Sequence, residues 1–369
     1  MPVFNRSFLI LACGTCLLFF QCKTSGMEKS ILTYLDESGK YKPIMNLKEW
    51  EIRRKQILNG MEAAMGKLPS REGLPPMDIQ YVDSLKGTNY TRFTIRFTVA
   101  ENETLPAYLY IPDNKVGKDK FPAMVALHET DSIGKQSVDG QGKNKNLAYA
   151  KELAGRGYVV IAPDYPGFGD LQPYDFSVDR YQSGTMKGIF DHIRCIDLLV
   201  SREEVDPDRI GVIGHSLGGH NAMFVGAFDT RLKVIVSSCG WTPFAYYDLG
   251  EEVAKKYGGR LGPYAQDRYM PLLREKYNVE GDKFPFDFID VIASFAPRAF
   301  FSNSPEQDGN FEVKGVRAGI GEASKVYRLF GRENLLQVSY PDAKHDFPVE
   351  VRMEAYRFID SVLGVRGID

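Results

Sequence analysis

From Ala123 onward, short apolar runs alternate with helix-compatible stretches, and this alternation constrains the fold more than any other feature of the chain. The runs are rich in β-branched and aromatic residues, as expected of strands that are buried on both faces. We expect strands at Ala123–Leu127, Tyr158–Ala162, Ile210–Ile213, Val234–Ser237, Ala299–Ser302 and Leu335–Tyr340. We expect helices at Asn146–Arg156, Lys187–Arg202, Gly219–Phe228, Gly315–Phe330 and Val349–Leu363. Strands linked by helices pair in parallel, so the sequence predicts an α/β fold with a mostly parallel sheet flanked by helices.

The stretch before these strands shows two other patterns. Apolar residues recur at helical spacing from Leu47 to Leu68, which predicts a helix that packs on the main body. From Met77 to Ile111 the spacing becomes two, which predicts an antiparallel β-meander that delivers the chain to the first buried strand. We therefore expect residues 27–90 to form an N-terminal helix and strands on a main domain at residues 91–369.

One long segment departs from the alternation. Residues from Trp241 to Ser294 are polar and aromatic, and they lie between two expected strands. Open α/β sheets bind ligands outside the carboxyl ends of their strands, so we expect this segment, 241–294, to be a cap-like insertion that forms part of a binding site. A second excursion, Leu171 to Met186, is rich in Tyr, Asp and Ser and could reach the same rim.

One expected strand leads directly into the sequence GHSLGG. Ile210 to Ile213 is followed by G-x-S-x-G from Gly214 to Gly218, and a helix-compatible segment comes next. A serine on such a sharp turn needs neighbours without a Cβ, because the strand and helix backbones pass close to it. Ser216 would stand at the edge of the sheet, with the N–H groups and positive dipole end of the helix behind it. The pattern predicts that Ser216 is a nucleophile; the plainer interpretation is a tight turn that merely contains a serine.

The first 26 residues have the pattern of an export signal and linker. Arg6 precedes an apolar run, Phe8–Phe20, that is too short to span a bilayer comfortably, and polar residues follow. Cys22 lies just past the run, where a bacterial lipoprotein would be cleaved and acylated, but Phe20-Gln21 fits poorly with the small residues that such sites prefer. Lipidation of Cys22, and membrane anchoring through it, therefore stays open. We expect a protein of the bacterial periplasm or an outer-membrane lipoprotein.

Composition excludes several other classes. A chain of 369 residues, 43% hydrophobic and 25% charged, fits a globular protein, and a net charge of -2 gives no basic surface for nucleic acid. Cys195 and Cys239 each lie on an apolar stretch, and we expect them to be separate core residues. No H-E-x-x-H or equivalent ligand spacing occurs, and Gly167-Phe168-Gly169 is too short for a phosphate loop. We expect no metal and no cofactor.

Four sequence segments carry a family resemblance. These are GHSLGG at the turn, LHET after the first buried strand, APDYPGFGD after the next and KHDF near the C-terminus. Together they resemble the α/β-hydrolase fold family, and most closely its dienelactone-hydrolase and acetyl-xylan-esterase-like branch, in the members that carry a serine nucleophile. The resemblance covers residues from about Thr91 to the end. It implies a catalytic triad in the chain order serine, acid, histidine.

The resemblance directs the search for the base and the acid. Among the five histidines, only His345 lies in a loop between the last strand and the last helix, the place expected of a triad base. In the family the acid follows the penultimate strand by about five to seven residues, which favours Asp308, with Glu306 as the competitor. We expect the neighbouring Asp346 to fix the loop of the base.

The same resemblance implies an oxyanion hole of two backbone N–H groups. One belongs to Leu217, and the other to the loop after the first buried strand, at Thr130 or Glu129. Many relatives carry glycine where this chain has Glu129. An acidic side chain beside an oxyanion is unfavourable unless it points away or binds a substrate hydroxyl.

These residues together predict an exported serine hydrolase that cleaves carboxylic esters by a Ser-His-Asp acyl-enzyme mechanism. Acetyl-type esters of carbohydrates are the expected substrates, because aromatic residues of the insertion could stack on sugar rings. Trp241, Tyr264 and Arg268 are the candidate substrate-binding residues, although these aromatic residues could equally pack the insertion onto the sheet. The alternatives are an exported prolyl-oligopeptidase-like peptidase, a general carboxylesterase and a binding protein on a retired hydrolase fold.

Overall fold

The computed structural model describes residues 30–113, 120–177 and 180–365. The expected export segment, residues 1–26 with Cys22, lies outside the described residues. Among the helices of the described chain, none is both long and apolar enough to cross a membrane.

The centre of the molecule is a nine-stranded sheet with the order β11-β10-β9-β8-β6-β7-β5-β4-β3. Six of these strands run parallel, as the sequence predicts. They are β6 (Phe121–Leu127), β7 (Val159–Pro163), β8 (Val205–His215), β9 (Leu232–Ser238), β10 (Ala299–Asn303) and β11 (Leu336–Ser339). Residues of β6, β7 and β10 are buried throughout, in agreement with strands covered on both faces.

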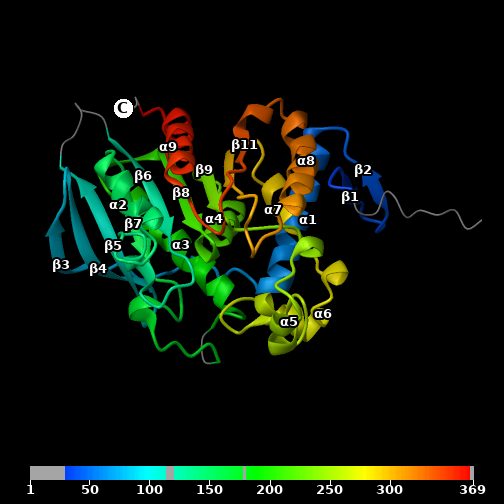
Figure 1. Cartoon of the computed structure of the whole chain (residues 1–369), viewed down its shortest axis with the longest axis horizontal. Coiled ribbons are helices and arrows are strands. Elements are labelled where there is room, and N and C mark those ends of the chain that lie inside the picture. Colours follow the sequence, from blue (N-terminus) through cyan, green and yellow to red (C-terminus); the bar gives the residue numbers. More distant parts are fainter. Residues whose placement is uncertain (1–29, 114–119, 178–179, 366–369) are drawn as a thin grey trace, which may run out of the picture.

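The expected meander forms the other side of the same sheet. It consists of β3 (Gln80–Lys86), β4 (Tyr90–Ala100) and β5 (Glu103–Pro112), which pair antiparallel in sequence. β5 also pairs antiparallel with β7, and so it joins the meander to the parallel strands. The meander therefore extends the main sheet and is continuous with it (Figure 1).

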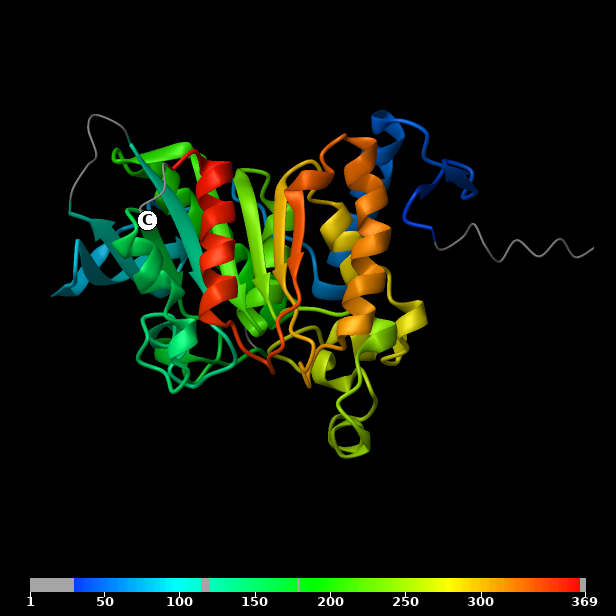
Figure 2. The same cartoon turned by 45° about the horizontal axis from the view of Figure 1, so that its top comes forward.

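Helices cover both faces of this sheet (Figures 1 and 2). Residues of α1, α3, α4, α7 and α8 share one apolar core with one face, and residues of α2 and α9 share a second core with the other. The bounds are α1 (Leu47–Met65), α2 (Tyr149–Gly155), α3 (Gly184–Ser201), α4 (Leu217–Phe228), α7 (Phe288–Ala293), α8 (Val313–Leu329) and α9 (Val349–Leu363). The α/β-hydrolase architecture expected from the sequence is thus confirmed.

The N-terminal region differs from the expectation in two details. A small hairpin, β1 (Thr33–Leu35) with β2 (Tyr41–Pro43), precedes α1, and three residues per strand are too few to show a period in the sequence. The Asn46 side chain caps α1 by accepting the N–H groups of Lys48 and Glu49. The helix then ends at Met65, three residues before the expected end at Leu68, and the chain turns at Gly66 with φ 98°.

The segment 241–294 folds into short helices between β9 and β10. They are α5 (Glu251–Tyr257), α6 (Leu272–Tyr277) and α7, with 3-10 turns at Phe244–Tyr246, Gly262–Ala265 and Gly281–Lys283. Asp287 ties this segment together, because its carboxylate accepts N–H groups of Phe288 and Phe244 as well as capping α7. The loops and short helices of this segment extend beyond one end of the sheet (Figure 2).

Candidate active site

The turn between β8 and α4 holds Ser216 in an unusual backbone conformation. Its φ of 54° and ψ of -116° lie outside the regions that most side chains favour. A Cβ on Gly214 would lie 2.1 Å from the carbonyl oxygen of Gly218, and one on Gly218 would lie 2.0 Å from that of Leu127. Glycine is therefore required on both sides of Ser216, and this sharp turn presents the serine at the mouth of a pocket.

His345 and Asp308 come together although 37 residues separate them. Nδ1 of His345 lies 2.9 Å from Oδ1 and 3.0 Å from Oδ2 of Asp308. Burial alone would raise the pKa of Asp308, but the hydrogen bond and charge of His345, with the N–H of Asn310, hold this pKa below its ordinary value. An ionised Asp308 keeps the proton of a neutral His345 on Nδ1, which leaves Nε2 free to accept a proton.

The two other acidic candidates near this pair are engaged elsewhere. Glu306, the competitor for the acid, is exposed and forms an ion pair with Arg317. The carboxylate of Asp346 accepts hydrogen bonds from Asn144 and Asn146, at 2.8 and 2.7 Å. Asp346 therefore fastens the loop of His345 to a neighbouring loop, as expected.

His345 is adjacent to the turn that carries Ser216. Its ring centroid lies 4.9 Å from that of His215, which directly precedes the serine. Among the described residues, no hydrogen bond joins the Ser216 hydroxyl to His345; such bonds often form only when substrate is bound. Burial lowers the pKa of His215 to about 3, so this neighbour stays neutral beside the base.

Three backbone N–H groups near Ser216 are unused within the described chain. They belong to Leu217, at the first turn of α4, and to Glu129 and Thr130, in the loop after β6. The Glu129 carboxylate accepts a hydrogen bond from Ser137 at 2.8 Å. Leu217 and Thr130 both line the pocket beside Ser216, as an oxyanion hole requires.

His128 fixes the position of this loop. Its Nε2 accepts the N–H of Tyr165 at 2.9 Å, so its Nδ1 must carry the proton and donate to the carbonyl oxygen of Glu129 at 2.6 Å. The ring thereby links the end of β6 to the loop after β7. This gives His128 a positioning role.

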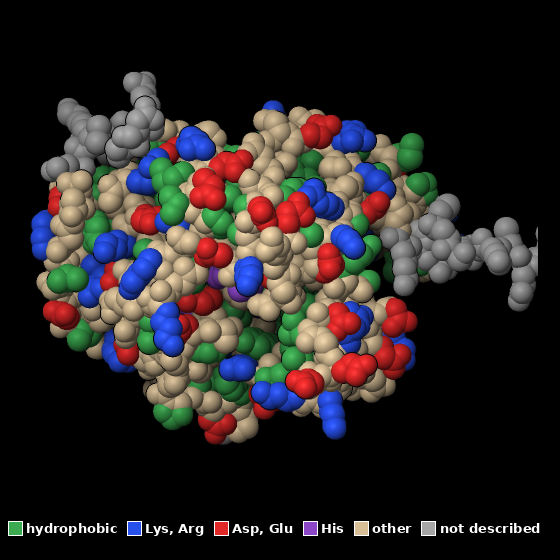
Figure 3. All heavy atoms as spheres, viewed as in Figure 1, with side chains coloured by type: hydrophobic (Ala, Val, Ile, Leu, Met, Phe, Trp, Pro, Cys, Tyr) green, Lys and Arg blue, Asp and Glu red, His purple; other side chains and the backbone are tan. Residues whose placement is uncertain are grey.

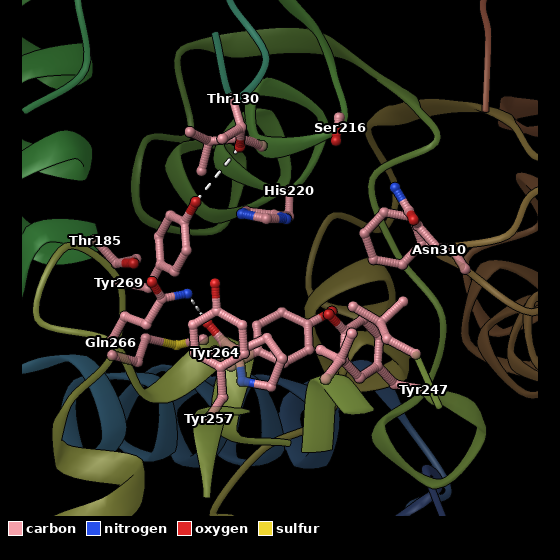
Figure 4. A pocket seen from close by; sticks show the side chains of 16 residues that line it. Thr130, Thr185, Ser216, His220, Tyr247, Tyr257, Tyr264, Gln266, Tyr269 and Asn310 are labelled. Carbon is pink, nitrogen blue, oxygen red and sulfur yellow. Dashed lines mark hydrogen bonds between the residues drawn. The ribbon is translucent and has the colours of Figure 1, made fainter. Parts of the chain in front are cut away.

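A cavity of about 210 Å³ opens beside Ser216. Nine of its sixteen lining residues belong to the segment 241–294, so the insertion forms much of its wall, as expected. Figure 3 shows a hollow walled by hydrophobic side chains in the middle of one face, and Figure 4 shows the lining side chains. The lining residues are Thr130, Thr185, Ser216, Leu217, His220, Tyr247, Leu249, Val253, Tyr257, Pro263, Tyr264, Gln266, Tyr269, Met270, Asn310 and Phe311. Thr185 comes from the excursion 171–186.

The three expected substrate-binding residues have different positions. Tyr264 lines the cavity and is largely buried. Trp241 does not line it: the ring is buried, and its Nε1 donates to Ser302 at 3.0 Å, so this residue packs the insertion onto β10. Arg268 does not line it either, and its guanidinium lies over the ring of Tyr269, 5.2 Å from the centroid.

Cys239 is the nearby residue that sequence reasoning did not connect with the site. Its sulfur, a carboxylate oxygen of Asp308 and a ring nitrogen of His345 lie within 4.8 Å of one another. Burial raises the pKa of the Cys239 thiol, and Sγ donates to the carbonyl oxygen of Asp346 at 3.2 Å. These contacts fit a protonated thiol that supports the loop of His345. The one sequence feature that could have pointed to Cys239 is its position directly after β9.

Comparison with known proteins places the chain in a family. A model described as the alpha/beta hydrolase family matches residues 145–352. YtaP of Bacillus subtilis, named as a hydrolase, is 27% identical over 321 residues, 84% of this chain and 99% of the relative. The carbohydrate esterase MZ0003, from an unknown prokaryotic organism, is 25% identical over 351 residues, 81% of this chain and 78% of the relative.

A solved structure agrees with these sequence relatives. A glucuronoyl esterase from Solibacter usitatus is 20% identical and has a TM-score of 0.69, with 90% of this chain and 96% of that chain covered. This likeness concerns the fold, and the fold is the one that the four sequence segments predict. Sequence, architecture and relatives therefore agree that the chain belongs to the alpha/beta hydrolase family.

Proposed function

We propose that this hydrolase cleaves carboxylic esters through Ser216, with His345 as general base and Asp308 as the acid that orients it. The single observation that carries this proposal is convergence at one place. The constrained Ser216 lines the cavity together with Leu217 and Thr130, whose N–H groups are unused within the described chain. His345, paired with Asp308, lies beside His215 and beside Phe311 of the cavity wall. These components follow the carboxyl ends of four strands, β6, β8, β10 and β11, as in open α/β enzymes.

The reaction follows from this arrangement. His345 accepts the Ser216 proton at Nε2 while Oγ attacks the acyl carbon, and Asp308 stabilises the imidazolium that forms. The N–H groups of Leu217 and Thr130 hold the oxyanion, and the alcohol leaves with the proton from His345. Water then attacks the acyl-enzyme by the same proton transfers, which releases the acid and restores Ser216.

Carbohydrate esters of a small acyl group, such as acetate, are the substrates that we propose. Four tyrosines line the cavity, and aromatic faces of this kind pack well against sugar rings. The names of the relative MZ0003 and of the glucuronoyl esterase support a carbohydrate ester. The small volume of the cavity favours a short acyl chain or a single sugar unit.

Hydrolysis of a 4-nitrophenyl acyl series by the full chain tests the chemistry. We expect turnover that falls steeply beyond acetate and drops by about 10³-fold or more in Ser216→Ala. Turnover that survives in Ser216→Ala would refute the mechanism. Acetylated xylo-oligosaccharides, a methyl ester of glucuronic acid and aminoacyl arylamides then separate the substrate classes, and cleavage of arylamides alone would refute the esterase proposal.

We also propose export, with Cys22 as the site of lipidation. The apolar run and the position of Cys22 after it support this proposal. Fractionation of bacterial cells that express the full chain should recover it outside the cytoplasm. Radiolabelled palmitate should enter the full chain and not Cys22→Ser; equal labelling, or none in either, would overturn lipidation.

A further inference from the structure

The cavity beside Ser216 has a wall without formal charge. None of its sixteen lining residues in the described chain is Lys, Arg, Asp or Glu. Burial lowers the pKa of His220, one turn after the serine, to about 4. Burial also raises the pKa of Tyr247 and that of Tyr264, so both phenols stay protonated at neutral pH.

Neutral polar groups are present in the same wall. The side chains of Thr130, Thr185, Gln266 and Asn310 line the cavity, and His220 lies between Ser216 and the tyrosines of the insertion (Figure 4). These groups can exchange hydrogen bonds with hydroxyls, but they offer no ion pair. A carboxylate that entered would lose water and gain no counter-charge, which is costly.

Two buried polar groups of residues in the cavity wall lack a hydrogen bond within the described chain: Nδ1 of His220 and the hydroxyl of Tyr264. The Tyr264 hydroxyl has no partner among the described residues, although its residue is only 5% exposed. A buried unpaired hydroxyl destabilises a fold, and a substrate that supplies a partner recovers that cost. Tyr264 also packs at 4.7 Å from Tyr247 and 6.3 Å from His220, ring centroid to centroid, so it is fixed in the wall.

Arg268 is a cation that contacts two residues of the cavity wall, Gln266 and Tyr269. Arg268 donates to Gln266 Oε1 at 3.0 Å, and its guanidinium lies over the rings of Phe168 and Tyr269. These contacts keep its charge out of the wall. An anionic substrate that formed an ion pair with Arg268 would have to break these contacts.

We propose that the site selects esters whose bound portion is uncharged and carries hydroxyl groups, with Tyr264 as a specificity-determining residue. This inference rests on the proposed ester hydrolysis and narrows its substrates to esters of neutral sugars. Esters of sugars that retain a free carboxylate are poor substrates.

A matched pair of substrates isolates the charge. Methyl glucuronide and methyl glucuronamide, each acetylated at the same hydroxyl, differ only in carboxylate against amide. We expect kcat/KM to be at least about tenfold higher for the amide at neutral pH. Equal kcat/KM values for the two substrates, or a higher value for the carboxylate, would overturn the proposal. If wild type preferred the carboxylate and Arg268→Gln did not, anion binding would be assigned to Arg268.

A second experiment tests Tyr264. We expect Tyr264→Phe to lower the ratio of kcat/KM for the acetylated glucuronamide to that for 4-nitrophenyl acetate by at least about fivefold. Tyr327→Phe is the matched control, because it removes a buried hydroxyl that donates to the carbonyl oxygen of Arg298 and does not line the cavity. The control should leave the ratio unchanged, and an equal ratio in wild type and Tyr264→Phe would remove Tyr264 from the proposal.

Ester hydrolysis through Ser216 and the selection of uncharged esters can be refuted separately. Ester turnover that survives in Ser216→Ala refutes the proposed mechanism. Turnover that requires Ser216 but ignores the substrate's charge refutes only the selection of uncharged esters.

Discussion

Replacing Asp308 with asparagine changes one atom of the proposed triad and nearly nothing of its shape. Oδ1 of Asp308 accepts the N–H groups of Asn310 and Phe311, at 2.8 and 3.3 Å. In Asp308→Asn the amide oxygen can keep these two bonds, which places the NH₂ group near the Oδ2 position, 3.0 Å from Nδ1 of His345. A donor there favours the tautomer with its proton on Nε2, and that tautomer cannot take the proton of Ser216.

We expect a large loss of turnover in Asp308→Asn. The Asp308 side chain is only 2% exposed, and water therefore cannot replace the carboxylate. We expect kcat to fall by about 10⁴-fold, about 5 kcal/mol of transition-state stabilisation. The assay is steady-state hydrolysis of 4-nitrophenyl acetate, with circular dichroism and thermal unfolding to show that the fold is kept.

Glu306→Gln is the matched control, since Glu306 lies two residues away and pairs with Arg317 on the surface. It should keep most of the wild-type kcat, because exposed ion pairs contribute little. A folded Asp308→Asn that retains more than about a tenth of the activity, or a large loss in Glu306→Gln, would refute the reasoning.

Three further changes test other parts of the structure. Gly218→Ala places a Cβ 2.0 Å from the carbonyl oxygen of Leu127, so it should abolish turnover and lower the melting temperature. A variant with normal kcat would contradict the interpretation that the turn at Ser216 requires glycine here. Lys135→Met leaves the fully buried Asp164 without its 2.6 Å partner, so chemical denaturation should show about 3–5 kcal/mol lost, and a loss below about 1 kcal/mol would refute this. Burial lowers the pKa of His192 to about 3, so its stabilising contribution is present above the unfolded pKa near 6.5 and is lost as pH falls. Between pH 6 and 4 the unfolding free energy of wild type relative to His192→Gln should therefore fall by about 1.4 kcal/mol per pH unit, and a constant difference would show that His192 does not titrate this way.

Local patterns in the sequence were sufficient to predict the parallel strands of the sheet and the sharp turn at Ser216. The six parallel strands follow from apolar runs that only two-sided burial accommodates, and the turn at Ser216 follows from glycines that backbone contact requires. The hairpin of β1 and β2 was missed, because strands of three residues have no readable period.

The lining of the site depends on contacts between distant segments, which one sequence cannot reveal. Trp241 and Tyr264 are both aromatic residues of one insertion, yet one packs on β10 and the other lines the cavity. Cys239 lies near Asp308 and His345 because β9, which precedes Cys239, pairs with β10, which precedes Asp308.

The sequence by itself therefore determined the fold class and a short set of candidate catalytic residues, because periodicity and turn chemistry are local properties of the chain. Only the tertiary structure decided that His345 meets Asp308 while Glu306 meets Arg317. It also decided that the cavity wall carries no charge. Those facts depend on how loops and an insertion pack at the carboxyl ends of the strands, and that packing is set by long-range contacts.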